Sequence, residues 1–177
     1  MPRYALLVRG INVGKAKRLA MADLRALLAD AGYTDIRTLL NSGNAVLTGP
    51  EADPAEQAAR IEGAIAERTG LDVRCVVLTA EQLRAVVDAH PFTEVATNGS
   101  RMMAHVLAAE PEPERLAAHD PVALDPDNAR LVGRVIYQWC PDGLLEAPPV
   151  GGFAEKHLGV AVTTRNWNTI SKLADLL

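Results

Sequence analysis

The run YALLV, residues 4 to 8, predicts a strand near the start of the chain. It is apolar throughout and stops abruptly at the loop sequence RGINVG. A strand without polar alternation needs cover on both of its faces, so we expect residues 4–8 to form an interior strand. The other strand and helix patterns are placed relative to this one.

Glycine, proline and capping residues separate the elements that follow. Apolar residues recur at helical spacing over residues 21–31, and Gly32 is placed as the C-terminal cap. The strands IRTLL and AVLT flank NSGN, where glycine tolerates the positive φ of a tight hairpin. Asp53 and Pro54 open a further helix, which Gly70 closes.

The next segments complete one unit and begin another of the same order. VRCVVL predicts a strand, and Thr79 with Gln82 has capping-box spacing at the start of a helix. The first half therefore has the order β-α-β-β-α-β-α. The segments MMAHVLA, EPERLAAH, ARLV, VIYQW, FAEKHL, VAVTT and WNTISKLADLL repeat this order, with a second hairpin at Gly133 and Arg134.

We expect an α+β fold of two ferredoxin-like (βαββαβ) halves packed together, because this order is that of the split βαβ unit. The first subdomain is predicted over residues 1–90 and the second over residues 101–177. Residues 91–100 are the predicted linker, since proline and glycine cluster there and the periodicity lapses. The halves share no evident sequence identity, so element order alone indicates the duplication.

Composition argues against several classes of protein. The chain has 177 residues and a net charge of -4, which disfavours bulk attraction to nucleic acid or to anionic membranes. The strand AVLTG lacks the aromatic platform of an RNA-recognition motif. The four histidines, His90, His105, His119 and His157, show no metal-ligand spacing. We therefore expect no metal, no cofactor and no nucleic-acid partner.

The cysteines and the N-terminal sequence indicate the cytosol. Cys75 and Cys140 lie inside apolar runs, where buried structural thiols are favoured over reactive ones. The start MPRYALLVRG has no signal-peptide h-region. No apolar stretch approaches the roughly 18 to 20 residues of a membrane span. We expect a cytoplasmic protein without a membrane partner, and oligomerisation is left open.

Two polar loops are predicted to meet at one end of the first sheet. In a ferredoxin-like unit the first two strands run in the same direction, so the loop after the first lies beside the hairpin after the second. RGINVG and NSGN could present backbone N–H groups to an anion, or each could be an ordinary turn. Lys15, Lys17 and Arg18 beside them are either phosphate contacts or a solvated loop. GKAKR lacks the spacing of a P-loop.

The stretch TTRNWNT, residues 163–169, combines a helix start with further polar groups. Asn166 is placed as the N-cap of the last helix, and Arg165 beside that helix start is well placed for a carboxylate or phosphate. Trp167 is either a stacking platform or a core residue. If the three motifs converge, Arg9 and Arg165 need an anion or a carboxylate between them. The candidate ligand-binding residues are Arg9, Gly10, Asn12, Gly14, Lys15, Asn41, Ser42, Gly43, Asn44, Thr164, Arg165, Asn166 and Asn168.

These stretches resemble a bacterial family of uncharacterised proteins, domain-of-unknown-function family 1697. The resemblance is carried by YALLVRGINVG, LNSGNAVL, HPF and LGVAVTTRNWNT, and it extends over nearly the whole chain. It implies an α+β fold with ferredoxin-like subdomains and no established activity. Family members usually have a second glycine where this chain has Lys15, and a Ser-Lys pair where it has Ala147 and Pro148. If that lysine holds an anion, this chain has lost it or replaced it with Lys15.

The sequence supports three functional hypotheses. The first is a cytosolic protein that binds a phosphate- or carboxylate-bearing small molecule at the polar loops. The second is an enzyme acting on such an anion, with Arg9 and Arg165 stabilising developing negative charge. The third is a structural or oligomeric interaction module. No reaction and no catalytic residue are predicted.

Overall fold

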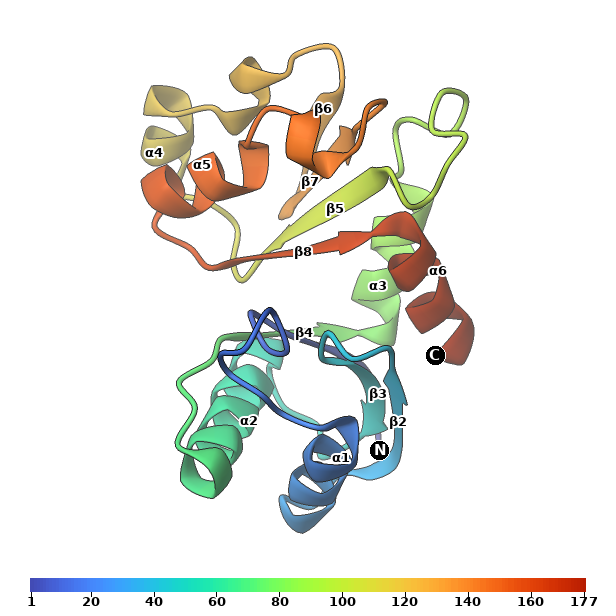
Figure 1. The fold of residues 1–177 in the computed structure, drawn as a ribbon, viewed down its shortest axis with the longest axis vertical. Coiled ribbons are helices and arrows are strands. Elements are labelled where there is room, and N and C mark those ends of the chain that lie inside the picture. Colours follow the sequence, from blue (N-terminus) through green and yellow to red (C-terminus); the bar gives the residue numbers. More distant parts are fainter. The chain divides into compact units, whose positions relative to one another are not determined.

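The computed structural model describes all of residues 1–177, and the chain divides into two compact units. The first unit comprises Met1–Arg84 and Leu173–Leu177, and the second comprises Ala85–Lys172. Each unit contains one four-stranded antiparallel sheet (Figure 1). None of the helices is long and apolar enough to cross a bilayer.

The first unit is a ferredoxin-like βαββαβ unit. Its elements are β1 (Arg3–Val8), α1 (Met21–Asp30), β2 (Thr34–Leu39), β3 (Asn44–Thr48), α2 (Pro54–Thr69) and β4 (Cys75–Thr79), followed by α3 (Ala80–Asp88). The strand order is β2-β3-β1-β4, and each neighbouring pair is antiparallel. Strand β1 is therefore interior, and all of its residues from Tyr4 to Val8 are buried. The prediction from the apolar run is confirmed.

Local capping chemistry explains where several of these helices begin and end. Asp53 accepts a hydrogen bond from the backbone N–H of Ala55 at 2.8 Å at the start of α2, and Gly70 ends that helix with φ of 72°. Thr79 and Gln82 form the reciprocal capping box, with N–O distances of 3.0 and 3.1 Å. These predicted caps are confirmed.

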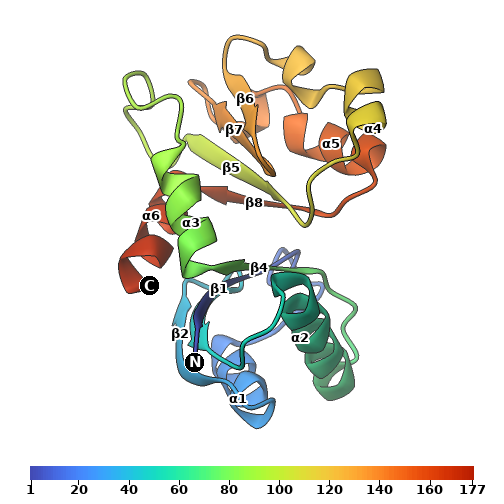
Figure 2. The same cartoon turned by 180° about the vertical axis from the view of Figure 1, so that it is seen from behind.

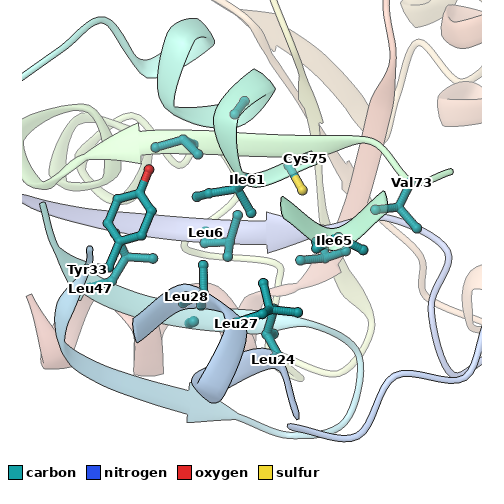
Figure 3. Packing of buried hydrophobic residues seen from close by; sticks show 14 of the residues in the cluster. Leu6, Leu24, Leu27, Leu28, Tyr33, Leu47, Ile61, Ile65, Val73 and Cys75 are labelled. Atoms are coloured by element: carbon teal, nitrogen blue, oxygen red, sulfur yellow. The ribbon is translucent and has the colours of Figure 1, made fainter. Parts of the chain in front are cut away.

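The core of the first unit lies between its sheet and helices α1 and α2 (Figure 3). Leu6 and Leu47 project from the sheet, and Leu28 and Ile61 project from the two helices. Cys75 belongs to the same buried cluster, and burial raises the pKa of its thiol well above the ordinary value. This cysteine is the buried structural thiol that its apolar run predicts.

The second unit has the same topology, seen from behind in Figure 2. Its elements are β5 (Met102–Leu107), α4 (Pro113–Ala118), the 3-10 turn η1 (Pro121–Leu124), β6 (Ala129–Val132), β7 (Val135–Trp139), the 3-10 turn η2 (Leu144–Glu146), α5 (Val150–Leu158) and β8 (Val162–Asn166), followed by α6 (Trp167–Leu176). The strand order is β6-β7-β5-β8. Leu107, Ile136, Ala154 and Leu158 contribute to the core between this sheet and its helices.

The limits of the two units differ from the predicted subdomains at residues 1–90 and 101–177 and the predicted linker at residues 91–100. The first unit gives way to the second within α3, and the last five residues belong to the first unit. The Arg3 guanidinium donates to the carbonyl oxygens of Leu176 and Leu177, at 2.6 and 3.1 Å, which ties the C-terminus to β1. Residues 91–100 belong to the second unit and include the buried Phe92. The guanidinium carbon of Arg130 lies over the Phe92 ring, 5.6 Å from its centroid.

Candidate functional site

Two loops meet at one end of the first sheet, and we call them the loop pair: residues 9–20, which follow β1, and the hairpin residues 40–43. The Val8 amide donates to the carbonyl of Gly43 at 2.7 Å. The Asn12 amide donates to the carbonyl of Asn41, also at 2.7 Å. Their proximity follows from the parallel course of β1 and β2 on either side of β3.

Asn12 holds the loop pair together. Its Nδ2 also donates to the carbonyl of Leu19 at 2.7 Å, and its Oδ1 accepts the Leu19 amide at 2.9 Å. Its own backbone amide donates to the carbonyl of Lys17 at 3.0 Å. The side chain is therefore committed to the loop itself, and its part in a site is to shape the backbone around it.

The backbone of the loop pair is in an unusual conformation. Gly10, Asn12 and Gly14 have φ values of 71°, 57° and 63°, so positive φ recurs at every second residue. Positive φ at alternate residues is a feature of anion nests, in which successive N–H groups turn toward one concavity. The loop pair also holds three of the four non-glycine residues with positive φ, the others being Lys17 and Leu40. Strained backbone concentrated in this way is typical of functional loops.

Two exposed cations flank this backbone. Lys15 and Arg18 are exposed and have no hydrogen-bond or ion-pair partner within the chain. Lys17 differs, because its ammonium group donates to the carbonyl of Asp72 at 2.8 Å. Of the three basic residues Lys15, Lys17 and Arg18, the first and last are thus available to an external anion, and Lys17 stabilises the loop.

The hairpin side chains divide in the same way between structure and surface. Asn44 is fully buried, and its Nδ2 donates to the carbonyl of Leu39 at 3.0 Å and to the Ser42 hydroxyl at 2.8 Å. Gly43 is confined by Val8, because a Cβ added there would lie 2.8 Å from the Val8 Cβ. Asn41 and Ser42 are exposed. Asn44 and Gly43 therefore close the hairpin.

The third predicted motif, TTRNWNT, lies in the second unit, and its first four residues end strand β8. Asn166 is the predicted N-cap of α6: its Oδ1 accepts the amide and the hydroxyl of Thr169 at 3.0 and 3.1 Å. The Trp167 ring packs against those of His90 and Tyr137 in tilted arrangements, with ring centroids 4.3 and 6.0 Å apart. Asn168 lies against Gly99, where an added Cβ would come too close to the Asn168 Oδ1. Most of this motif therefore has structural partners.

Arg165 is the cation of this motif. Its Nη1 donates to the carbonyl of Thr164 at 2.9 Å. Burial lowers the pKa of Arg165 to about 10, so the guanidinium remains charged at neutral pH although it is poorly solvated.

A buried polar network that the sequence did not predict lies in the second unit. Gln138 Nε2 donates to Asp125 Oδ2 and to the carbonyl of Pro148, both at 3.0 Å. Because Nε2 faces two acceptors, Oε1 faces the His105 ring and is 2.9 Å from its Nε2. His105 Nε2 must then carry the proton, and Nδ1 accepts the hydroxyl proton of Thr164 at 2.7 Å. Burial lowers the pKa of His105, in keeping with a neutral ring.

One signal in the sequence indicates this network in retrospect. His105 and Gln138 each interrupt an otherwise apolar strand, and Thr164 lies in the mostly polar strand β8. A polar residue in one buried strand is common, but one in each of three neighbouring strands indicates a hydrogen-bonded network. Recognising it requires the register of the strands, which spacing alone does not supply.

Comparison with known proteins defines the family. The family described as "Protein of unknown function (DUF1697)" matches residues 1–137. The chain belongs to this family. A conserved bacterial protein from Streptococcus pneumoniae has a similar structure, with 23% identity, a TM-score of 0.73 and coverage of 99% of this chain and 98% of that one. No curated protein matches. The DUF1697 assignment confirms the resemblance, and the structural likeness at this identity shows the shared α+β fold.

The DUF1697 match covers only part of the candidate residues. It includes both members of the loop pair, residues 9–20 and 40–43, and it ends at Tyr137 in strand β7. Residues 163–169 lie beyond the matched region. The loop pair is therefore the candidate site that falls within the family match.

Proposed function

We propose that the loop pair binds a small molecule bearing a phosphate or carboxylate group. The observation that carries this proposal is the recurrence of positive φ at Gly10, Asn12 and Gly14 next to the exposed Lys15 and Arg18. Backbone N–H groups of the loop other than that of Asn12, which already donates to the Lys17 carbonyl, would hydrogen-bond the anion, and the two cations would neutralise its charge. The Asn12 side chain fixes the loop in this conformation before the ligand arrives.

Arg165 is a further proposed anion contact, in the second unit. Its burial leaves the guanidinium poorly solvated, and a bound anion would stabilise that charge. Asn166 and Thr164, in contrast, already use their side chains within the second unit. We therefore assign them supporting roles.

The test is anion-dependent thermal stabilisation. Melting curves of the wild type are recorded with phosphate, AMP or succinate, each against chloride at matched ionic strength. A ligand present at about a hundred times its Kd should stabilise the protein by roughly 2.7 kcal/mol. The variant Lys15→Gln/Arg18→Gln should lose most of this shift, because both neutralising charges are removed.

The matched control is Lys156→Gln, which removes an exposed lysine in the second unit. It should keep the full anion effect. Equal loss in the control would indicate a general charge effect, and the absence of any anion-specific shift in the wild type would refute the proposal. Arg165→Ala tests the second contact separately.

A further inference from the structure

The two sheets have equivalent ladders, which allows a residue-by-residue comparison of the units. In the first sheet Leu6 of β1 pairs with Val77 of β4. The same place in the second sheet is taken by His105 of β5 and Thr164 of β8. The apolar pair belongs to the core of the first unit, whereas the polar pair is joined by a 2.7 Å hydrogen bond.

Gln138, the third member of the network, likewise replaces an apolar residue of the first sheet. Leu47 of β3 pairs with Tyr4 of β1, and the equivalent partner of Met103 in β5 is Gln138 of β7. Leu47 is a buried core residue, and Gln138 is fully buried as well.

The fold itself therefore does not require polar residues at these three positions, because the first unit builds the same core from aliphatic side chains. Buried polar groups stabilise a fold little or not at all compared with well-packed apolar ones. Departures of this kind from the simplest core are found at functional sites.

The network ends at a carboxylate whose charge is not balanced. Asp125 is 8% exposed, and its two oxygens accept from Asn128 Nδ2 at 3.1 Å and from Gln138 Nε2 at 3.0 Å. Both donors are neutral amides, and no arginine, lysine or histidine pairs with this carboxylate. A carboxylate can accept about four hydrogen bonds, so about two acceptor positions remain. A buried charge without a counter-charge is destabilising.

A pocket of about 150 Å³ opens beside this carboxylate. Its lining includes Asp125, Asn128, Cys140, Asp142, Glu146 and Pro148. No basic side chain lines it, and Asp142 and Glu146 add exposed negative charge at its edge. A water molecule occupies about 30 Å³ of liquid, so the space suits a group of only a few non-hydrogen atoms.

We propose that this pocket binds a small organic ammonium group, whose N–H bonds are donated to Asp125. The ammonium would supply both the missing counter-charge and the missing donors. Gln138 is a positioning residue: the contact with His105 holds its amide so that Nε2, and not Oε1, faces the carboxylate. The site lies entirely within the second unit and is independent of the loop pair.

Methylammonium chloride is the probe, with sodium chloride and tetramethylammonium chloride as ionic-strength controls. Tetramethylammonium carries the same charge but no N–H donor. At about ten times its Kd, methylammonium should raise the Tm of the wild type by roughly 3 to 6 °C over both controls. In NMR titrations the side-chain NH₂ signals of Asn128 and Gln138 should shift saturably with methylammonium alone.

The decisive variant is Asp125→Asn, which removes the charge at nearly constant shape and should abolish the methylammonium shift. Its matched control is Asp127→Asn, an exposed aspartate two residues away that does not line the pocket. This control should retain the shift. If Asp125→Asn does not fold, the wild-type NMR titration decides. Equal effects of methylammonium and tetramethylammonium on the wild type, or an undiminished shift in Asp125→Asn, would overturn the proposal.

Discussion

Individual polar side chains differ widely in the number of hydrogen bonds that the folded chain gives them. Thr163 is 1% exposed, and its hydroxyl oxygen has no hydrogen-bond partner. Asn12 is the opposite case, with its side-chain amide making three hydrogen bonds within the loop pair. Substitution should therefore stabilise the chain at the first position and destabilise it at the second.

Thr163→Val should raise the free energy of unfolding by about 1 kcal/mol, because a methyl group replaces a hydroxyl that is desolvated without compensation. Urea denaturation measures this change. The control is Thr169→Val, at a buried threonine whose hydroxyl does have a partner, Asn166. The Thr169→Val variant should lose about 1 kcal/mol of unfolding free energy. A loss of stability in Thr163→Val would show that its hydroxyl is satisfied.

Asn12→Asp should destabilise the chain by about 2 to 4 kcal/mol. The substitution removes the donors to the carbonyls of Leu19 and Asn41 and places a negative charge against both oxygens. Asn41→Ala is the control, since only the Asn41 backbone takes part and its side chain is exposed. That control should change the unfolding free energy by less than about 0.5 kcal/mol. Similar values for the two variants would contradict the role assigned to Asn12.

At the scale of elements, the two sheets show that one topology tolerates two kinds of core. Capping residues and hairpin glycines set the limits of strands and helices in both units. The helix-facing side of the sheet is apolar in the first unit, whereas in the second it carries the network of His105, Gln138 and Thr164. The network must therefore be complete to be tolerated.

Gln138→Leu introduces the residue found at the equivalent position of the first unit, yet it should destabilise the chain by about 2 to 4 kcal/mol. The change leaves the His105 Nε2–H, the Asp125 carboxylate and the Pro148 carbonyl without their partner. Chemical denaturation gives the value.

The combined variant His105→Leu/Gln138→Leu/Thr164→Val is the informative comparison. It should recover part of the loss, because the stranded His105 Nε2–H is removed and Thr164, which is bonded to His105, is replaced as well. A strictly additive result would show that the three side chains do not form one network.

At the scale of the whole molecule, charge governs how stability and association depend on solution conditions. Burial lowers the pKa of His105 and also that of His90. The chain as a whole carries a net charge of -4. The lowered histidine pKa values make stability depend on pH, and the negative net charge disfavours binding to polyanions such as nucleic acid.

Stability should fall as the pH drops below about 6.5, the ordinary pKa of histidine. The folded-state pKa of His105 lies below this value, so the unfolded chain binds more protons in that range. The stabilisation is fully present above about pH 6.5 and is lost as the pH falls toward the folded-state pKa. Urea midpoints between pH 5 and pH 8 measure it, and the slope should be shallower in the combined apolar variant. An unchanged slope would assign the effect to other groups.

Binding to nucleic acid should be weak and sensitive to salt. The net charge is negative, and the exposed cations of the loop pair are Lys15, Lys17 and Arg18, of which Lys17 also donates to the backbone carbonyl of Asp72. Few phosphate contacts release few counterions, so affinity should be low and should vanish at high salt. Fluorescence anisotropy with a labelled oligonucleotide checks this. Tight binding that persists at high salt would contradict it.

Periodicity and capping chemistry were enough to predict the order of elements, the interior strand at residues 4–8 and the helix caps at Asp53, Thr79 and Asn166. They also predicted that the loop pair meets, because that follows from strand direction alone. These features depend on residues close in sequence or on topology. The limits of the two units were less accessible, since Arg3 holds the C-terminal residues in the first unit.

The polar network needed the three-dimensional structure. His105, Gln138 and Thr164 are far apart in sequence, and a shift of one residue in strand register would turn any of them to the opposite face of the sheet. The same holds for the pocket beside Asp125, whose lining comes from the loop between η1 and β6, from the end of β7 and from residues around η2. Local pattern determines which segments become strands and helices. Register and loop packing determine which side chains meet, and those depend on contacts formed only in the folded chain.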